Sequence, residues 1–115
     1  MSEHPAKNPI SIDDFAELQL RSARVLVAEA HPNAERLMRL EVDLGNEQRQ
    51  IIAGIAEHYT PAELLGKTII IVANLKPAKL RGLSSQGMLL AATGPEGTTR
   101  LITVDGDLPP GAKIS

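Results

Sequence analysis

Short stretches in which apolar and polar residues alternate recur along the chain, and this alternation is typical of β-strands with one buried face. It is cleanest at 40–44, and the most apolar candidate strand contains the β-branched run 69–72. The expected strands span 20–28, 40–44, 49–55, 67–75, 86–92 and 100–104, with turns at 45–46 and 94–97. Taken alone, this pattern predicts a small, mainly β protein, either a barrel or a sandwich.

Two capping signals predict short helices outside these strands. Ser11, followed three residues later by Asp14, predicts one or two helical turns that continue through Leu18. The run Thr-Pro-Ala-Glu at 60–63 also predicts the start of a helix. The threonine is the N-cap, the proline occupies the first helical position, and the glutamate can accept a hydrogen bond from the backbone of the N-cap. Gly66 is expected to end this second helix.

Size and composition indicate one ordinary globular domain: 115 residues, of which 43% are hydrophobic and 23% charged. The absence of cysteine excludes disulfides, thiol catalysis and cysteine-based zinc sites. The longest uninterrupted apolar run, 69–73, is too short to span a bilayer, and residues 1–9 lack the apolar core of a signal peptide. We therefore expect a flexible leader over 1–9, one domain over 10–115, a cytoplasmic location and no membrane partner.

Positive charge is concentrated in one part of a mildly acidic chain. The whole chain has a net charge of −2, but the window 64–95 contains four cations and no acid, so it carries +4. The four cations are Lys67, Lys76, Lys79 and Arg81. Such segregation is typical of a surface that meets phosphates. An ordinary solvated basic loop would have the same pattern, so charge alone leaves both interpretations open.

Within this window, residues 74–88 (the basic segment) contain side chains suited to phosphate and ribose. Lys79 and Arg81 are two residues apart, so in an extended segment both would project from one face, as two successive phosphates require. Ser85 offers a hydroxyl, and Met88 offers an adaptable apolar surface. In the competing structural interpretation, Ser85 and the first residue of the segment cap turns, and Met88 belongs to the core.

Other chemistries find no support in the sequence. Phe15 and Tyr59 are the only aromatic residues, so nucleic-acid binding would rest on charge, shape and polar contacts rather than on base stacking. His4, His31 and His58 have neither cysteine neighbours nor a partner four residues away, and His31 is expected to shape the loop after the first strand. No nucleophile, base and orienting group form a set. We therefore expect no enzyme activity, no metal and no cofactor.

The basic segment reads Asn-Leu-Lys-Pro-x-Lys-Leu-Arg-Gly-x-x-Ser-x-Gly-Met and resembles the signature of the tRNA-binding domain at the C-terminus of bacterial methionyl-tRNA synthetases. Free-standing tRNA-binding proteins and cytokine-like modules of eukaryotic synthetase complexes are similar. The resemblance runs from about Ile10 to the end of the chain. Further matching stretches follow in family order at 10–15, 31–37, 42–45, 54–56 and 59–64. The chain departs from the family at Ala78, where a second basic residue is common, and at Ala53, where serine is common.

This resemblance implies a five-stranded OB-fold, a Greek-key barrel, with short helices and added N- and C-terminal segments for dimerisation. It implies a homodimer formed through 10–18 and 100–115, and structure-specific binding to the outer corner of tRNA, largely independent of base sequence. The tRNA-binding residues that it implies are Asn74, Lys76, Lys79, Arg81, Ser85 and Met88. Arg36, in a loop expected near the same face, is a weaker candidate.

Three functional hypotheses follow. In the first, the chain is a tRNA-binding module, free-standing or auxiliary to a synthetase of the methionyl type. In the second it is a dimeric, peptide-binding protein similar to the secretion chaperones that share this fold, with an exposed apolar groove and weak salt dependence. In the third it tethers proteins within a synthetase complex. The Lys-Leu-Arg-Gly run and the Ser-x-Gly-Met run favour the first.

Overall fold

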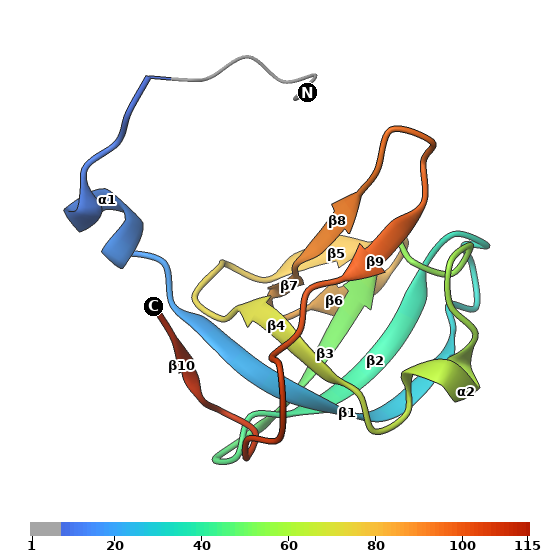
Figure 1. Ribbon diagram of the computed structural model, residues 1–115. Coiled ribbons are helices and arrows are strands. Elements are labelled where there is room, and N and C mark those ends of the chain that lie inside the picture. The colour runs from blue at the N-terminus through green and yellow to red at the C-terminus, as the bar shows by residue number, and fades with distance from the viewer. Residues whose placement is uncertain (1–7) are drawn as a thin grey trace.

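A curled antiparallel sheet forms the body of the molecule. The computed structural model describes residues 8–115, and the expectation of a flexible leader over 1–9 falls almost wholly outside them. The sheet has the strand order β3-β2-β1-β4-β7, and β10 also pairs with β1. Its strands are β1 (Leu20–Ala30), β2 (Met38–Asp43), β3 (Gln48–Ala53), β4 (Thr68–Val72), β7 (Met88–Leu89) and β10 (Lys113–Ile114). Figure 1 shows the sheet curling into a half-barrel.

The long strand β1 joins the two halves of this sheet. Its residues 20–24 pair with β4, and its residues 24–30 pair with β2. The register with β2 shifts between Val25 and Val27. Such a bulge bends a strand and increases its twist, so a single strand can serve both walls of the barrel.

Two short hairpins lie over the open side of the sheet. They are β5 (Ala78–Leu80) with β6 (Leu83–Ser85), and β8 (Ala91–Thr93) with β9 (Thr99–Leu101). Directly after β6, the backbone N–H of Gln86 donates to the carbonyl oxygen of Gln50 in β3 at 2.8 Å. The contact joins β3, one end of the curled sheet, to the segment that leads into β7, the other end. The result is the mainly β, OB-like barrel that the resemblance implied.

The two expected helices are present and begin where their caps predict. In α1 (Ile12–Ala16) the Ser11 hydroxyl accepts from the Asp14 N–H at 3.1 Å, and the helix ends two residues earlier than expected. In α2 (Pro61–Leu64) both hydrogen bonds of the capping box between Thr60 and Glu63 form. The bond from the Thr60 backbone N–H lowers the pKa of the Glu63 carboxyl. Among residues 8–115 no helix is long and apolar enough to cross a membrane.

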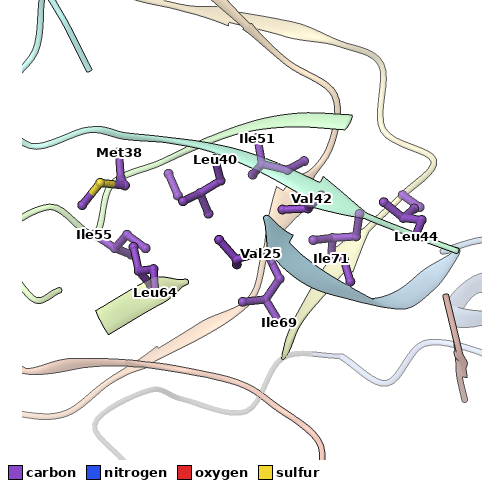
Figure 2. Packing of buried hydrophobic residues seen from close by; sticks show 13 residues of the cluster. Val25, Met38, Leu40, Val42, Leu44, Ile51, Ile55, Leu64, Ile69 and Ile71 are labelled. Atoms are coloured by element: carbon purple, nitrogen blue, oxygen red, sulfur yellow. The ribbon is translucent and has the colours of Figure 1, made fainter. Parts of the chain in front are cut away.

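The core fills the inside of the curled sheet, as Figure 2 shows. In β2 the buried residues Met38, Leu40 and Val42 alternate with partly exposed polar ones, as the sequence pattern predicted. Leu64 of α2 is fully buried and packs against the sheet at the end of the barrel. The other large buried side chains of the cluster are Val25, Leu44, Ile51, Ile55, Ile69 and Ile71.

The sequence pattern was wrong about the lengths of several strands and missed others. The expected strand 86–92 is divided into β7 and β8, and 67–75 is shortened to Thr68–Val72. The β5–β6 hairpin and β10 were not predicted. Each of these three strands has only two or three residues. β10 pairs with the distant β1, and β5 and β6 pair with each other while β6 is bonded to β3, so no local apolar pattern marks them.

Candidate nucleic-acid interface

The basic segment folds as a tight β-hairpin. In its register Ala78 lies opposite Ser85 and Leu80 opposite Leu83, so Arg81 and Gly82 alone form the turn. Both have positive φ, +54° and +93°, which is the requirement of the two-residue turn that best matches strand twist. Arg81 is the one non-glycine residue among 8–115 with positive φ. The hairpin therefore holds an arginine at its tip in a conformation that side chains other than glycine and asparagine rarely adopt.

This geometry corrects one expectation from the sequence. Lys79 and Arg81 were expected to project from the same face of an extended segment, and that is wrong because Arg81 lies in the turn rather than in a strand. Lys79 is in β5 and pairs with Ser84. The guanidinium of Arg81 instead donates to the carbonyl oxygen of Asn33, in the loop between β1 and β2, at 3.3 Å. The two charges are thus displayed from the arm and from the tip of one hairpin.

The cations of the hairpin are exposed and carry uncompensated charge. Lys76, Lys79 and Arg81 all lie at the surface, and the four ion pairs found in residues 8–115 involve other arginines. Arg39, by contrast, bridges Glu29 and Glu41, and its hydrogen bond to Glu41 raises its pKa further above the ordinary value. Arg39 is thus committed within the protein, and the hairpin cations are free to meet an anion.

The root of the hairpin is bonded to β3. Ser85 is buried. Its hydroxyl accepts from the Ile52 N–H at 3.0 Å and donates to the Gly87 carbonyl at 2.8 Å. The side-chain amide of Gln50 donates to the Ser84 carbonyl at 2.7 Å. The guanidinium of Arg49 donates to carbonyls at both ends of the segment, those of residues 73 and 86. The barrel wall thus acts as a rigid support for the cations.

Ser85 therefore has a structural task where the sequence suggested a direct contact. Replacing it with alanine is expected to reduce the free energy of unfolding by about 1–3 kcal/mol, because the buried N–H of Ile52 is left without a partner. Urea denaturation measures this loss. Ser84→Ala is the matched control, since only the backbone carbonyl of that serine is bonded to Gln50. An equal effect of both substitutions would contradict the assignment.

Asn74 and Met88 frame the hairpin from its two ends. The Asn74 side chain accepts from the Gln19 N–H at 2.8 Å and donates to the Glu17 carbonyl at 2.6 Å, so it ties the segment after α1 to the start of the basic segment. Met88 is 50% exposed in β7, and the interpretation of it as a core residue is wrong. With Leu75 it places apolar surface beside the cations.

The loop between β1 and β2 lies against the hairpin tip. Residues 30–37 and Arg81 together line an open cleft of about 820 Å³. Arg36 is on this cleft, 83% exposed, with Glu57 3.6 Å away as an ion-pair partner in the solvent. An exposed pair of this kind contributes little, so Arg36 can turn to a ligand. In the part of the chain that the structure describes, no group of three potential metal ligands occurs.

The contribution of three supporting residues could not be read from the sequence. Arg49 and Gln50 looked like ordinary strand residues, yet both bind backbone carbonyls that are 24 to 37 residues away in the sequence. His31 was expected to shape its own loop, and it does so, but it also contacts the hairpin at Leu80. No local pattern distinguishes these residues, because their partners are defined only by the closure of the barrel.

Comparison with known proteins points to one family. The family model described as "Putative tRNA binding domain" matches residues 20–113. Methionine–tRNA ligases of Thermotoga maritima and Methanococcus aeolicus are 62% and 52% identical over 109 and 105 residues, which are 95% and 91% of this chain. The matched regions are only 17% and 15% of the lengths of these ligases, so the chain spans about one-sixth of such relatives.

Two solved structures extend the comparison. A MetRS-related protein from Pyrococcus horikoshii superimposes with a TM-score of 0.89 and 40% identity, over 95% of this chain and 100% of that one. The chaperone CsaA from Bacillus anthracis superimposes with a TM-score of 0.84 and 33% identity, over 93% and 99% of the two chains.

Proposed function

The chain belongs to the tRNA-binding domain family, and from this premise we propose that it binds folded tRNA through the basic hairpin and the adjoining loop 31–37. Membership rests on the family model, which covers residues 20–113, and on the 40% identity with a solved relative over its whole length. The ligand class follows from the family, and the surface follows from the geometry of the hairpin.

The observation that carries the proposal is the set of exposed cations on a rigid hairpin. Lys76, Lys79 and Arg81 have no ion-pair partner among residues 8–115, and no acid occurs anywhere in 64–95. Cations held in this way meet phosphates at a low ordering cost. With no tryptophan and two aromatic residues in the chain, recognition relies on backbone shape and 2′-hydroxyls rather than on stacked bases.

The site residues take different parts in this proposal. Lys76, Lys79 and Arg81 contact phosphates directly, Met88 adds apolar contact, and Arg36 approaches from the loop beside the tip. Asn74 and Ser85, whose side chains already bond within the protein, support the hairpin from its ends.

A second copy of the chain completes the proposed binder. The helix α1 has no buried residue, and it exposes Ile12 and Phe15, with Leu18 following. A cleft beside it is lined by 16–21, Asn74, and Lys113 and Ile114 of β10. We propose that 10–18 and 100–115 form the contact between two copies. Two weak sites on one tRNA would then bind with higher avidity than either alone.

The biological role that we propose is to raise the tRNA affinity of a synthetase of the methionyl type, in the same chain or as a separate partner. Support comes from the identity to one-sixth of several methionine–tRNA ligases. In this role the chain binds tRNA without catalysing a reaction, and it acts in the cytoplasm.

The proposal is tested by titrating folded tRNA at several salt concentrations. We expect log K to fall with log salt with a slope of about −3 for each chain that engages the tRNA, because each chain makes three phosphate contacts. Double-stranded RNA of the same length is the control for shape, and it should bind more weakly. A salt-independent interaction with tRNA would contradict the proposal.

The likeness to CsaA supports a second candidate, a peptide-binding chaperone. The exposed Leu75, Leu80 and Met88 provide apolar surface within the same segment, 74–88, as the cations. Peptide binding that hardly depends on salt, with no tRNA binding, would favour this candidate. Capture of a synthetase in the absence of RNA would instead favour a tethering domain.

A further inference from the structure

His31 lies directly after β1 and connects two segments that are far apart in the sequence. It is 5% exposed. Its Nε2 atom lies 3.0 Å from the carbonyl oxygen of Leu80, the last residue of β5, and its Nδ1 atom lies 2.9 Å from the backbone nitrogen of Asn33. The ring therefore sits between its own loop and the hairpin that carries the basic residues.

The two contacts define how the ring must be protonated. A backbone N–H can only donate, so Nδ1 of His31 accepts from Asn33. A carbonyl oxygen can only accept, so Nε2 carries the proton and donates to Leu80. Only the neutral tautomer with hydrogen on Nε2 satisfies both partners. Both nitrogens are thus committed within the protein, and the ring has none left for a ligand.

The bond to Leu80 acts on the strained turn beside it. The carbonyl of Leu80 and the N–H of Arg81 belong to one planar peptide unit, so holding the carbonyl fixes the plane from which φ of Arg81 is measured. That φ is +54°, a value costly for arginine. The side chain of Arg81 is held as well, because its guanidinium donates to the Asn33 carbonyl at 3.3 Å. His31 and Asn33 therefore hold the hairpin tip through two hydrogen bonds, one to the backbone of Leu80 and one to the side chain of Arg81.

We propose that His31 is a positioning residue of the tRNA-binding hairpin, which holds the Leu80–Arg81 peptide so that Arg81 presents its charge in one fixed place. The inference rests on the proposed function for its biological meaning. Without the bond to Leu80, the Leu80–Arg81 peptide samples a wider range of orientations within the turn, and the Arg81 side chain must be ordered again when tRNA binds. Preorganisation of this kind improves affinity without adding a contact.

Two substitutions of His31 separate positioning from packing. Asparagine can keep an acceptor near the position of Nδ1 but cannot reach Leu80, whereas glutamine can place an amide N–H near the position of Nε2. We expect His31→Asn to weaken tRNA binding about three- to tenfold, the cost of ordering one long side chain, and His31→Gln to restore most of the affinity. His58→Asn, a partly buried histidine beside α2, is the matched control and should leave binding unchanged. Equal affinities of the asparagine and glutamine variants would overturn the proposal.

A double-mutant cycle asks whether His31 acts through Arg81. In an Arg81→Ala background, His31→Asn should cause no further loss of affinity, because the side chain that it positions is gone. The same loss in both backgrounds would overturn the proposal and leave tRNA binding by the hairpin intact. If Arg81→Ala itself left tRNA binding unchanged, the role of the tip in the proposed function would be wrong instead.

A measurement without RNA tests the positioning step by itself. NMR of the ¹⁵N-labelled imidazole should show a proton on Nε2 of His31 and none on Nδ1. The ¹⁵N order parameter of the Arg81 amide reports how firmly the peptide is held, and it should fall in His31→Asn relative to the wild type. An unchanged Arg81 order parameter in a folded variant would overturn the inference, whatever the outcome with tRNA.

Discussion

Replacing both Lys79 and Arg81 with alanine is expected to lower the affinity for folded tRNA about a hundredfold at low salt. Each cation would lose one charge-assisted hydrogen bond to a phosphate, at about 1.5 kcal/mol or tenfold in affinity. The slope of log K against log salt should become shallower by about two, because two fewer counterions are released. Both side chains are exposed, so the fold should be retained. Titrations at three or more salt concentrations measure both quantities.

The control for this variant removes the same charge from elsewhere on the surface. Lys67 is exposed, directly precedes β4 and lies outside both the hairpin and the proposed contact between copies. Lys67→Glu lowers the net charge by the same two units but leaves the hairpin intact. If this control weakened tRNA binding as much as the hairpin variant, overall charge rather than the hairpin would account for the interaction.

Substituting Gly111 with alanine is expected to reduce the free energy of unfolding by about 2–4 kcal/mol, from positive-φ strain and overpacking together. An added Cβ would lie 2.1 Å from the carbonyl oxygen of Leu44, a backbone atom in the turn between β2 and β3. The same carbonyl accepts from the Arg21 side chain at 2.8 Å, and the Gly111 N–H donates to the Ser22 carbonyl at 2.8 Å. The C-terminal segment therefore has little freedom to move away from the clash.

A second glycine separates the two causes of this loss. Gly97 has φ of +88°, close to the +91° of Gly111, but an added Cβ there would meet no atom within 4 Å. Gly97→Ala should therefore show the backbone cost alone, about 1 kcal/mol. Urea denaturation of both variants gives the comparison. Equal losses would mean that the segment around Gly111 shifts freely, contrary to its hydrogen bonds.

Local signals predicted much of the fold correctly because their causes are local. The Ser11 cap and the Thr60–Glu63 capping box involve residues three apart, and both formed as expected. The alternation in β2 depends only on the period of a strand, and it correctly assigned the buried face. The β5–β6 hairpin was missed for the opposite reason. Its turn is Arg81-Gly82 rather than an asparagine–glycine or aspartate–glycine pair, and its short arms are held by β3.

The candidate site was predictable where it depends on charge and unpredictable where it depends on closure of the barrel. The cations could be found by counting acids and bases along the chain, because an uninterrupted basic stretch of this kind tends to remain solvated. The hydroxyl of Ser85 bonds to a backbone N–H 33 residues away, and the ring of His31 reaches a carbonyl 49 residues away. The sequence does not show which distant backbone groups such side chains will contact. A residue that supports the hairpin, such as Ser85, therefore could not be told apart from one that contacts the ligand.

The hydrogen bonds of Arg49 make the basic segment a module that can be exchanged. One guanidinium nitrogen of Arg49 binds the chain where the segment leaves β4 and again where it returns after β6, so both anchor points are fixed from the barrel side. Between these points the segment contributes nothing to the buried cluster of the barrel. A barrel built in this way can accept a different sequence between the anchors and keep its stability, as long as Ser85, whose hydroxyl satisfies the Ile52 N–H, is retained. Evolution can thus alter which nucleic acid or peptide is bound without having to refold the protein that presents the binding loop.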